Sequence, residues 1–290
     1  MTSVMERLDK HRGQVQTQSG PASYIDTGGP GRVALFVHGL GTSSYLWRHV
    51  IDQLDGQRRC VAVDLPLHGQ TPAAADQDFT LPGFARFLAE FCEGLELNDV
   101  DLVANDTGGA ISQVFATGHP ELLHTLTLTN CEAHNNLPPK VLLPAVWLAH
   151  MGLAARISPR LLRDIRRGRK RFYGLGYQDI ENLPEDLARF WLESQFATPE
   201  LARQNQRIMT SLHARDLLAI EPALARLQVP TLIVWGTGDK FFRLKWAYWL
   251  RDAIPGATEV VELSGARIFF PDERATELTA ALRRHWDAHP

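Results

Sequence analysis

The sequence has few of the features that mark secreted, membrane-spanning or nucleic-acid-binding proteins. It has only three cysteines in 290 residues, Cys60, Cys92 and Cys131, and their number and wide spacing predict neither a disulfide framework nor a metal site. We expect them to be buried small side chains. There is no run of about 18 apolar residues, and the first residues lack a signal-peptide core. The formal net charge of −3 does not indicate a nucleic-acid binder.

Signals for a cofactor are also missing. No Gly-x-Gly-x-x-Gly motif follows an apolar strand, and no two histidines have the spacing of metal ligands. We therefore expect a cytoplasmic protein with a small-molecule substrate, no metal, no organic cofactor, and no nucleic-acid or membrane partner. The sequence gives no indication of the oligomeric state.

The most informative segment runs from Leu102 to Ala110. An apolar strand is followed by a turn of small residues and then by an apolar helix, which is the setting of a nucleophile elbow. The residue at the turn is Asp106, which can form an ester intermediate by attacking saturated carbon. Two glycines follow it, as close packing of a strand against a helix requires. Because Asp-x-Gly-Gly also occurs in ordinary turns, this segment alone leaves a structural role open.

Apolar runs alternate with helical patterns along much of the chain. The runs at 33–37, 60–63 and 232–234 are continuous, which is typical of strands buried on both faces of a parallel sheet. Residues 123–132, in which leucines alternate with threonines at first, are expected to form another strand. The first 30 residues are polar, and we expect an irregular lead-in with one edge strand over Ala22 to Tyr24. In such sheets ligands bind beyond the carboxyl ends of the strands, where Leu40, Asp106 and Glu132 fall.

The pattern changes between residues 137 and 218, where prolines interrupt helical stretches and no strand is legible. We expect a helical cap there, over a core domain formed by residues 1–136 and 219–290. Within the cap, residues 156–171 carry eight Lys and Arg side chains against one acid, Asp164. Such a run predicts a solvated helix face, with an anion or partner site as the alternative. Most cap aromatics should form its core, with Trp147 a candidate for the pocket lining.

These features together resemble the α/β-hydrolase superfamily, and within it the branch of haloalkane dehalogenases and epoxide hydrolases. The segment from His38 to Arg48 is very similar to the dehalogenase loop, and Asn105 to Gly109 forms an aspartate elbow. The resemblance covers about residues 20–286. It implies an α/β-hydrolase fold, with a mostly parallel doubly wound sheet and the cap inserted after the sixth strand.

The resemblance also implies roles for individual residues. Asp106 would attack carbon, the backbone N–H of Leu40 would stabilise negative charge, and a histidine held by an acid would activate water. Glu132 and Asp239 both stand where that acid can lie, and Asp239 is the preferred candidate. The histidine is expected in the loop from Ser264 to Glu273, but Arg267 and Ile268 occupy its place.

Two further departures concern the leaving group. Dehalogenases hold the halide with side-chain N–H donors at the positions of Leu40 and Thr107, so haloalkane dehalogenation is not expected. Epoxide hydrolases use two cap tyrosines to protonate the opening oxygen. Tyr173 and Tyr177 are available for that role, although the sequence does not show where they point.

Three interpretations follow. In the first, another residue replaces the histidine, and His134, close after Glu132, is the best candidate. In the second, Asp106 is itself a general base whose pKa is raised by burial and by nearby acids. In the third, the chain is non-catalytic and binds a small apolar ligand. We expect a hydrolase acting on a small, largely apolar substrate.

Overall fold

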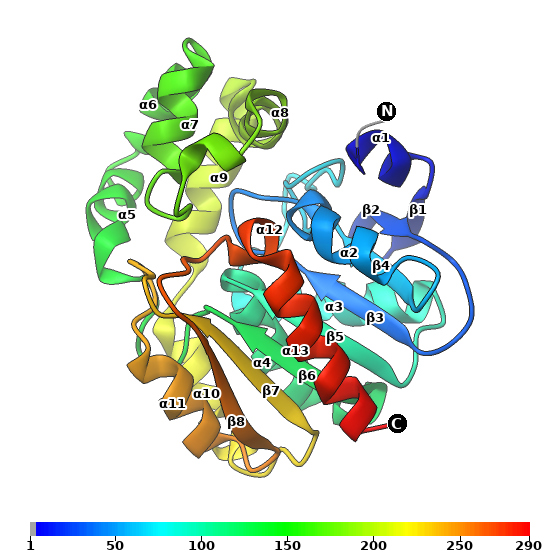
Figure 1. Ribbon diagram of the computed structural model, residues 1–290. Coiled ribbons are helices and arrows are strands. Elements are labelled where there is room, and N and C mark those ends of the chain that lie inside the picture. Colours follow the sequence, from blue (N-terminus) through cyan, green and yellow to red (C-terminus); the bar gives the residue numbers. More distant parts are fainter. Residues whose placement is uncertain (1–3) are drawn as a thin grey trace.

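The computed structural model, which describes residues 4–290, contains an eight-stranded sheet with helices on both faces (Figure 1). The strand order is β1-β2-β4-β3-β5-β6-β7-β8, and pairing is parallel from β4 to β8 and antiparallel at β1 and β2. The strands are β1 (Arg12–Thr17), β2 (Gly20–Asp26), β3 (Val33–Val37), β4 (Arg59–Val63), β5 (Val100–Asn105), β6 (Leu123–Thr129), β7 (Thr231–Gly236) and β8 (Ala257–Leu263). This is the α/β-hydrolase fold that the sequence predicts.

Helices outside the β6–β7 connection pack along the sheet. They are α1 (Val4–Asp9), α2 (Arg48–Leu54), α3 (Leu81–Gly94), α4 (Thr107–Gly118), α11 (Lys245–Ala253), α12 (Phe270–Glu273) and α13 (Ala275–Ala288). Helices α2 and α13 contact each other on one face, and α3 and α4 contact each other on the other (Figure 1). The strands β3, β5 and β7 are buried along their whole length, which explains their continuous apolar runs. Cys60, Cys92 and Cys131 are buried and unpaired, as expected.

The connection from β6 to β7 is helical, and most of it lies beyond the carboxyl ends of the strands (Figure 1). Its helices are α5 (Leu143–His150), α6 (Ala154–Ile157), α7 (Ile165–Tyr173), α8 (Glu185–Phe196), α9 (Pro199–Ser211) and α10 (Ala214–Leu224). Five short 3-10 turns complete the elements: η1 (Ser44–Trp47), η2 (Pro120–Leu122), η3 (Lys140–Leu142), η4 (Ser158–Leu162) and η5 (Ile180–Asn182). Helix α10 returns to the sheet and packs against α4.

The prediction of an irregular lead-in was wrong. Residues 12–26 form an antiparallel hairpin, β1–β2, in which β1 is the edge strand and β2 pairs with both β1 and β4. The polar side chains of β1, such as Gln14 and Gln16, are tolerated because only one residue of this strand, Thr17, is buried. An edge strand needs little apolar patterning, so the signal for β1 in the sequence was weak.

The basic segment was predicted as one helix face, and the structure divides it among α6, η4 and α7. Asp164 begins α7 by accepting a hydrogen bond from the Arg167 N–H through its side chain. Arg169 is the exception to the predicted exposure, since it is buried and bonds the Leu183 carbonyl and Glu181. The other basic side chains of residues 156–171 are exposed.

Candidate active site

Asp106 lies at a sharp turn between β5 and α4. Its backbone has φ 57° and ψ −138°, an unusual conformation for a residue other than glycine. The glycines around it allow close approach: a Cβ on Gly108 would lie 2.3 Å from the His38 carbonyl oxygen, and one on Gly109 would lie 2.4 Å from Cys131 Cβ. A Cβ on Gly39 would lie 2.3 Å from Asp106 Cβ. This is the nucleophile-elbow geometry that the sequence indicates.

The Asp106 carboxylate is held by backbone N–H groups. Leu40 and Thr107 both donate hydrogen bonds to it. Nevertheless, burial and then the negative charges of Glu132 and Asp239 raise the pKa of Asp106 well above its usual value. Three acidic groups therefore share one buried region.

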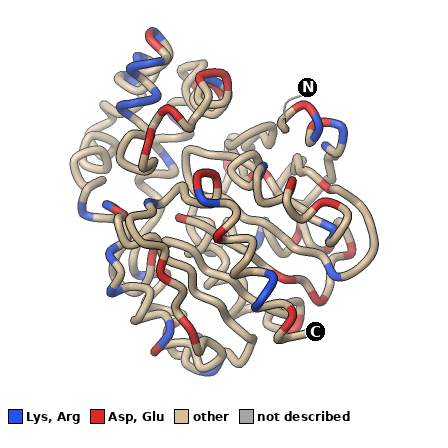
Figure 2. The backbone as a smooth tube through the Cα atoms, viewed as in Figure 1, with Lys and Arg blue, Asp and Glu red and all other residues tan. Residues whose placement is uncertain are grey.

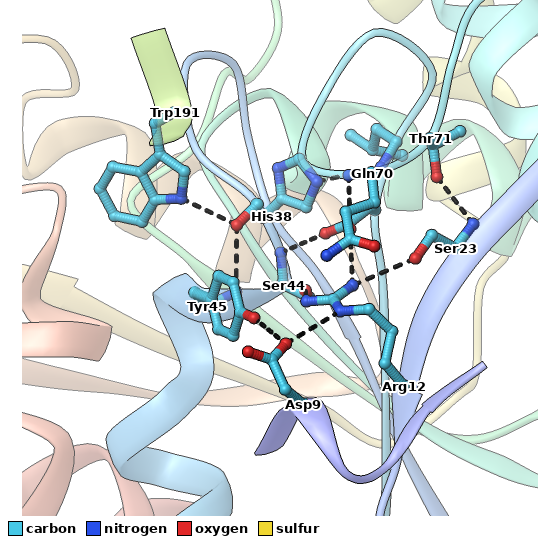
Figure 3. A network of polar contacts seen from close by, with 12 residues as sticks. Asp9, Arg12, Ser23, His38, Ser44, Tyr45, Gln70, Thr71 and Trp191 are labelled. Carbon is cyan, nitrogen blue, oxygen red and sulfur yellow. Dashed lines mark hydrogen bonds and ion pairs between the residues drawn. The ribbon is translucent and has the colours of Figure 1, made fainter. Parts of the chain in front are cut away.

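The loop that carries the Leu40 N–H is fixed by a polar network (Figure 3). Asp64 at its centre accepts from the Ser44 N–H at 2.8 Å, and it pairs with Arg12 at 2.9 Å. His38 accepts from the Leu65 N–H at 3.0 Å through Nε2, and its Nδ1 lies 2.7 Å from the Gly39 carbonyl oxygen. One ring nitrogen of His38 thus contacts its own loop, and the other joins that loop to the segment after β4.

Two contacts from the helical connection reach the same loop. Trp191 of α8 donates from Nε1 to Ser43 Oγ at 2.8 Å (Figure 3), and Tyr173 of α7 donates from its hydroxyl to the Gly41 carbonyl at 2.7 Å. The two bonded residues, Gly41 and Ser43, follow Leu40 closely in the chain. The position of the Leu40 N–H is therefore coupled to α7 and α8.

Glu132 follows β6 and faces the cavity described below. Its Oε1 accepts from the Thr107 hydroxyl at 2.8 Å, whereas Oε2 is buried without a hydrogen-bond partner. Burial raises the pKa of Glu132 to about 7. A carboxyl group with that pKa can change protonation state near neutral pH.

Asp239 follows β7 and is anchored by the backbone. One oxygen, Oδ1, accepts from the N–H groups of Phe241 at 2.5 Å and Phe242 at 2.7 Å, while Oδ2 is buried without a partner. Burial raises the pKa of Asp239 to about 6. Asp239 is not among the residues that line the cavity, whereas Glu132 is.

Ile268 lies beside the acidic cluster, in the loop after β8. It is 2% exposed and lines the cavity, and its carbonyl accepts from Asn105 Nδ2 at 3.0 Å. Arg267 points toward the loop after α7 and donates to the Tyr177 carbonyl at 2.7 Å. Its positive charge also lowers the pKa of Asp239, in opposition to the effect of burial. Among the described residues, no histidine lines this cavity.

His134 lies away from the acidic cluster. Its Nδ1 bonds the Glu221 carboxylate, and its ring packs 5.1 Å from the Trp249 ring and 6.0 Å from the Trp246 ring. His134 has a φ of 53°, which turns the chain after Ala133. The structure therefore does not bring His134 to Asp106, although the sequence separation from Glu132 suggested that it could.

A cavity of about 660 Å³ opens above Asp106, beneath the helical connection. Its walls are mostly apolar, and the acidic groups that line it near the sheet are Asp106 and Glu132. At its outer end the lining includes exposed arginines of the basic segment, namely Arg160, Arg163, Arg167 and Arg171. A cavity of this size fits a small, elongated apolar molecule.

The aromatic residues proposed for the pocket do not line it. Tyr173 is committed to the Gly41 carbonyl, and the Tyr177 hydroxyl bonds Asp272 Oδ2 at 2.8 Å. Both tyrosines are fully buried, and burial raises their pKa well above the usual value. Trp147 is 63% exposed on the outside of α5. The sequence could not reveal these directions, because they depend on how the helices pack.

Two asparagines support the site and were not singled out by sequence reasoning. The Asn130 side chain accepts from the Gly236 N–H at 2.6 Å and donates to the Gly236 carbonyl at 3.1 Å. The backbone carbonyl of Asn130 accepts from the Asp106 N–H at 3.0 Å. Asn105 joins Thr129 to the Ile268 carbonyl. A polar residue at or directly after the end of a strand was the available signal, since Asn105 is the last residue of β5 and Asn130 follows β6.

Comparison with known proteins is consistent with this geometry. Residues 33–273 match the family model of the alpha/beta hydrolase fold, and the chain belongs to that family. A haloalkane dehalogenase of Agrobacterium fabrum is 28% identical over 89% of this chain and 86% of its own length. Another, from Mesorhizobium japonicum, is 36% identical, but the match covers only 38% of this chain and 35% of that protein. A cis-3-alkyl-4-alkyloxetan-2-one decarboxylase of Xanthomonas campestris is 26% identical over 92% of this chain and 93% of its own length.

Solved structures share the fold. A lipase-like protein of Acinetobacter baumannii has a TM-score of 0.81 at 19% identity, covering 98% of this chain and 95% of its own. The epoxide hydrolase CorEH has a TM-score of 0.78 at 17% identity, covering 96% of this chain and 98% of its own. These structures show the fold, while the curated relatives named above include haloalkane dehalogenases and a decarboxylase.

Proposed function

We propose that this protein is a hydrolase of a small, largely apolar substrate and that Asp106 is its nucleophile. The observation that carries the proposal is the position of Asp106, at the elbow, on the cavity floor and hydrogen-bonded by two backbone N–H groups. In the proposed mechanism these N–H groups hold one carboxylate oxygen, and the other oxygen attacks the substrate. The helices between β6 and β7, within residues 137–218, act as the cap that closes the cavity.

The first step is attack of an Asp106 oxygen on a saturated carbon of the substrate. An O–C bond forms, the bond from that carbon to the leaving group breaks, and the electron pair goes with the leaving group. In the second step water adds to the carboxyl carbon of the new ester. Negative charge then develops on the oxygen that the N–H groups of Leu40 and Thr107 hold, so the same donors stabilise both steps.

Glu132 is our proposal for the group that activates this water in place of the usual histidine. Ile268 fills the position where the resemblance places a histidine, and His134 is bound to Glu221. Glu132 faces the cavity, has an unpartnered oxygen and has a pKa of about 7. It would take a proton from water and return it to the alcohol oxygen as the acyl C–O bond breaks.

The site favours a leaving group that departs as a stable anion and needs no proton donor. Leu40 offers no side-chain N–H for a halide, and neither Tyr173 nor Tyr177 lines the cavity to protonate an epoxide oxygen. A carboxylate leaving group needs no such donor. We therefore propose a strained cyclic ester with alkyl substituents as the substrate class, in keeping with the oxetan-2-one substrate in the name of one relative.

A second candidate function has one observation in its favour. Burial and two neighbouring acids raise the pKa of Asp106, so the group could act as a general base that removes a proton from water or substrate. In that mechanism no covalent ester forms. The third candidate, a non-catalytic member that binds a small apolar ligand, would use the same cavity.

Turnover in heavy-oxygen water separates these mechanisms. If Asp106 is the nucleophile, hydrolysis of its ester places an oxygen from water in the Asp106 carboxyl group, detectable in the peptide that contains residue 106. Substrates would be alkyl-substituted β-lactones, with haloalkanes and epoxides alongside, and Asp106→Asn would be the control. Turnover without label would favour the general-base mechanism. No turnover of any of these substrates would favour the binding protein.

A further inference from the structure

The outer face of α5 is apolar and exposed. Leu143, Trp147 and Met151 follow at intervals of four residues, which places them in one row along the helix, and their exposed fractions are 50%, 63% and 52%. The opposite side of the same segment, including Ala145 and Leu148, lines the cavity. A helix that is apolar on all sides is normally buried, so the outer row requires a partner.

Exposed large apolar side chains are concentrated in this part of the molecule. Of the eight in the described residues, seven lie between residues 141 and 175, and only Leu218 lies elsewhere. The seven are Val141, Leu143, Trp147, Met151, Ile157, Phe172 and Leu175. Scattered apolar residues need no explanation, whereas a cluster marks an interaction surface.

Positive charge lies directly beside this cluster. Residues 156–171 carry eight basic side chains and one acid, in a chain whose net charge is −3. Figure 2 shows Lys and Arg gathered along α6 and α7, next to the largely uncharged α5. Apart from Arg169, these side chains are exposed. The partner is therefore expected to be apolar in one part and anionic in another.

We propose that this cap face, defined by the α5 row and the exposed basic residues of 156–171, docks on an anionic phospholipid surface. Leu143, Trp147 and Met151 would enter the boundary between headgroups and acyl chains, where tryptophan is favoured, and the arginines would contact lipid phosphates. A second copy of the chain fits less well, because pairing two such faces would bring two positive clusters together.

The hydropathy of residues 140–162 is consistent with a position at the lipid surface. Within residues 4–290, no single helix has the length and apolar character needed to cross a bilayer; residues 140–150 and 154–162 meet both criteria only when taken together, and a bend of 92° separates them. The docking face departs from our sequence-based expectation of no membrane partner. The outward row on α5 was not predictable from an apolar run that could equally have been buried.

The location of the face has a consequence for substrate access. Val141, Ile157 and Arg160 are exposed and also line the cavity, so the cavity opens beside the proposed docking face. An apolar substrate could pass from the lipid to the cavity without crossing water. The docking proposal itself does not depend on the role of Asp106, and binding can be measured without substrate.

Flotation with lipid vesicles tests the proposal. The full chain should float with vesicles of phosphatidylglycerol and phosphatidylcholine in equal parts, and it should float much less with phosphatidylcholine alone or at high salt. The triple variant Leu143→Ser, Trp147→Ser, Met151→Ser should lose binding by more than about tenfold. The variant Arg156→Glu, Arg160→Glu, Arg163→Glu should lose a similar factor.

Matched controls lie on α10 and directly after it. Leu218→Ser removes the exposed apolar side chain outside the cluster, and Arg226→Glu reverses a basic charge outside it; both should bind vesicles as the unchanged chain does. Asp106→Asn should also bind normally. Circular dichroism and thermal unfolding would establish that each variant is folded.

Three outcomes would overturn the proposal. The first is absence of flotation of the unchanged, folded chain with anionic vesicles. The second is equal loss of flotation in the Leu218 or Arg226 controls. The third is a stable dimer, measured by sedimentation, that dissociates when Trp147 is replaced, because a second copy would then occupy the face.

Discussion

The hydroxyl of Thr107 donates a 2.8 Å hydrogen bond to Glu132 Oε1, and thus joins the residue after the proposed nucleophile to the acid that follows β6. Glu132 is consequently oriented from α4, and its second oxygen is the one left without a partner. Asp239 also has one anchored oxygen and one without a partner, but Glu132 lines the cavity and Asp239 does not, so Glu132 is the better candidate for water activation.

Replacing Glu132 separates the two proposed steps. In Glu132→Gln we expect the ester on Asp106 to form but to be hydrolysed about 10²–10⁴ times more slowly, because a positioned general base is lost. Intact-protein mass spectrometry after incubation with a β-lactone should show an adduct that accumulates in this variant and is absent from the Asp106→Asn, Glu132→Gln double variant. Unchanged steady-state turnover in Glu132→Gln would rule out the assigned role.

A histidine at position 268 should speed up hydrolysis of the ester. The Ile268 side chain is buried and lines the same cavity as Asp106 and Glu132, so we expect an imidazole there to bond water in that cavity. We expect Ile268→His to raise the single-turnover rate of ester hydrolysis by about tenfold or more. Ile268→Leu keeps an apolar side chain and is the control. Equal rates in both variants would show that position 268 does not face the reacting ester.

The buried acids should make stability depend on pH. The pKa of Glu132 is about 7 in the folded protein against an ordinary value of 4.5, so the folded state binds more protons between these values. Stability should therefore fall as pH rises from about 4.5 to about 7, and the Glu132 contribution is about 3 kcal/mol.

Urea unfolding at a series of pH values measures this effect. Glu132→Gln, which cannot ionise, should have a flatter profile and should be more stable than the unchanged chain above pH 7. Glu262→Gln alters an exposed acid of β8 and should leave the slope intact. A slope that survives in Glu132→Gln would assign the pH dependence to Asp106 or Asp239.

The contacts from α7 and α8 to the loop of Leu40 should affect catalysis more than folding. In Tyr173→Phe the hydrogen bond to the Gly41 carbonyl is lost while the ring remains, at a cost of about 1 kcal/mol. Trp191→Phe loses the hydrogen bond to Ser43 and also part of a fully buried ring, so it should destabilise the fold more. We expect a lower kcat with a smaller change in KM. Arg189→Gln, on the exposed side of α8, is the control. A loss confined to unfolding free energy would show that the contacts are purely structural.

The strands and turns that have a clear local sequence pattern were predictable. The buried runs such as Val33–Val37 and the turn at Asp106 appear in the sequence as apolar segments followed by small residues, and the structure has them there. The β1 strand was not legible, because an edge strand with polar side chains satisfies its backbone without an apolar pattern.

The directions of site side chains were less predictable than their positions along the chain. His134 is two residues from Glu132, yet its backbone conformation turns it toward Glu221, which is 87 residues away. Tyr177 likewise bonds Asp272, which is far along the chain and is brought near only by the packing of the β6–β7 connection against the segment after β8. Such choices depend on long-range contacts that a single sequence does not display.

Helices α7 and α8 are hydrogen-bonded to the loop after β3, which carries the Leu40 N–H. Movement of these helices to admit a substrate would therefore also affect the position of this N–H group. Helices that move aside to admit a molecule must release the Gly41 carbonyl or Ser43, and the Leu40 N–H between β3 and these anchors then loses part of its support. The donors that stabilise negative charge are fully in place only once the helices have returned. For the proposed reaction, opening of these helices would therefore weaken charge stabilisation at Asp106, and closing would restore it.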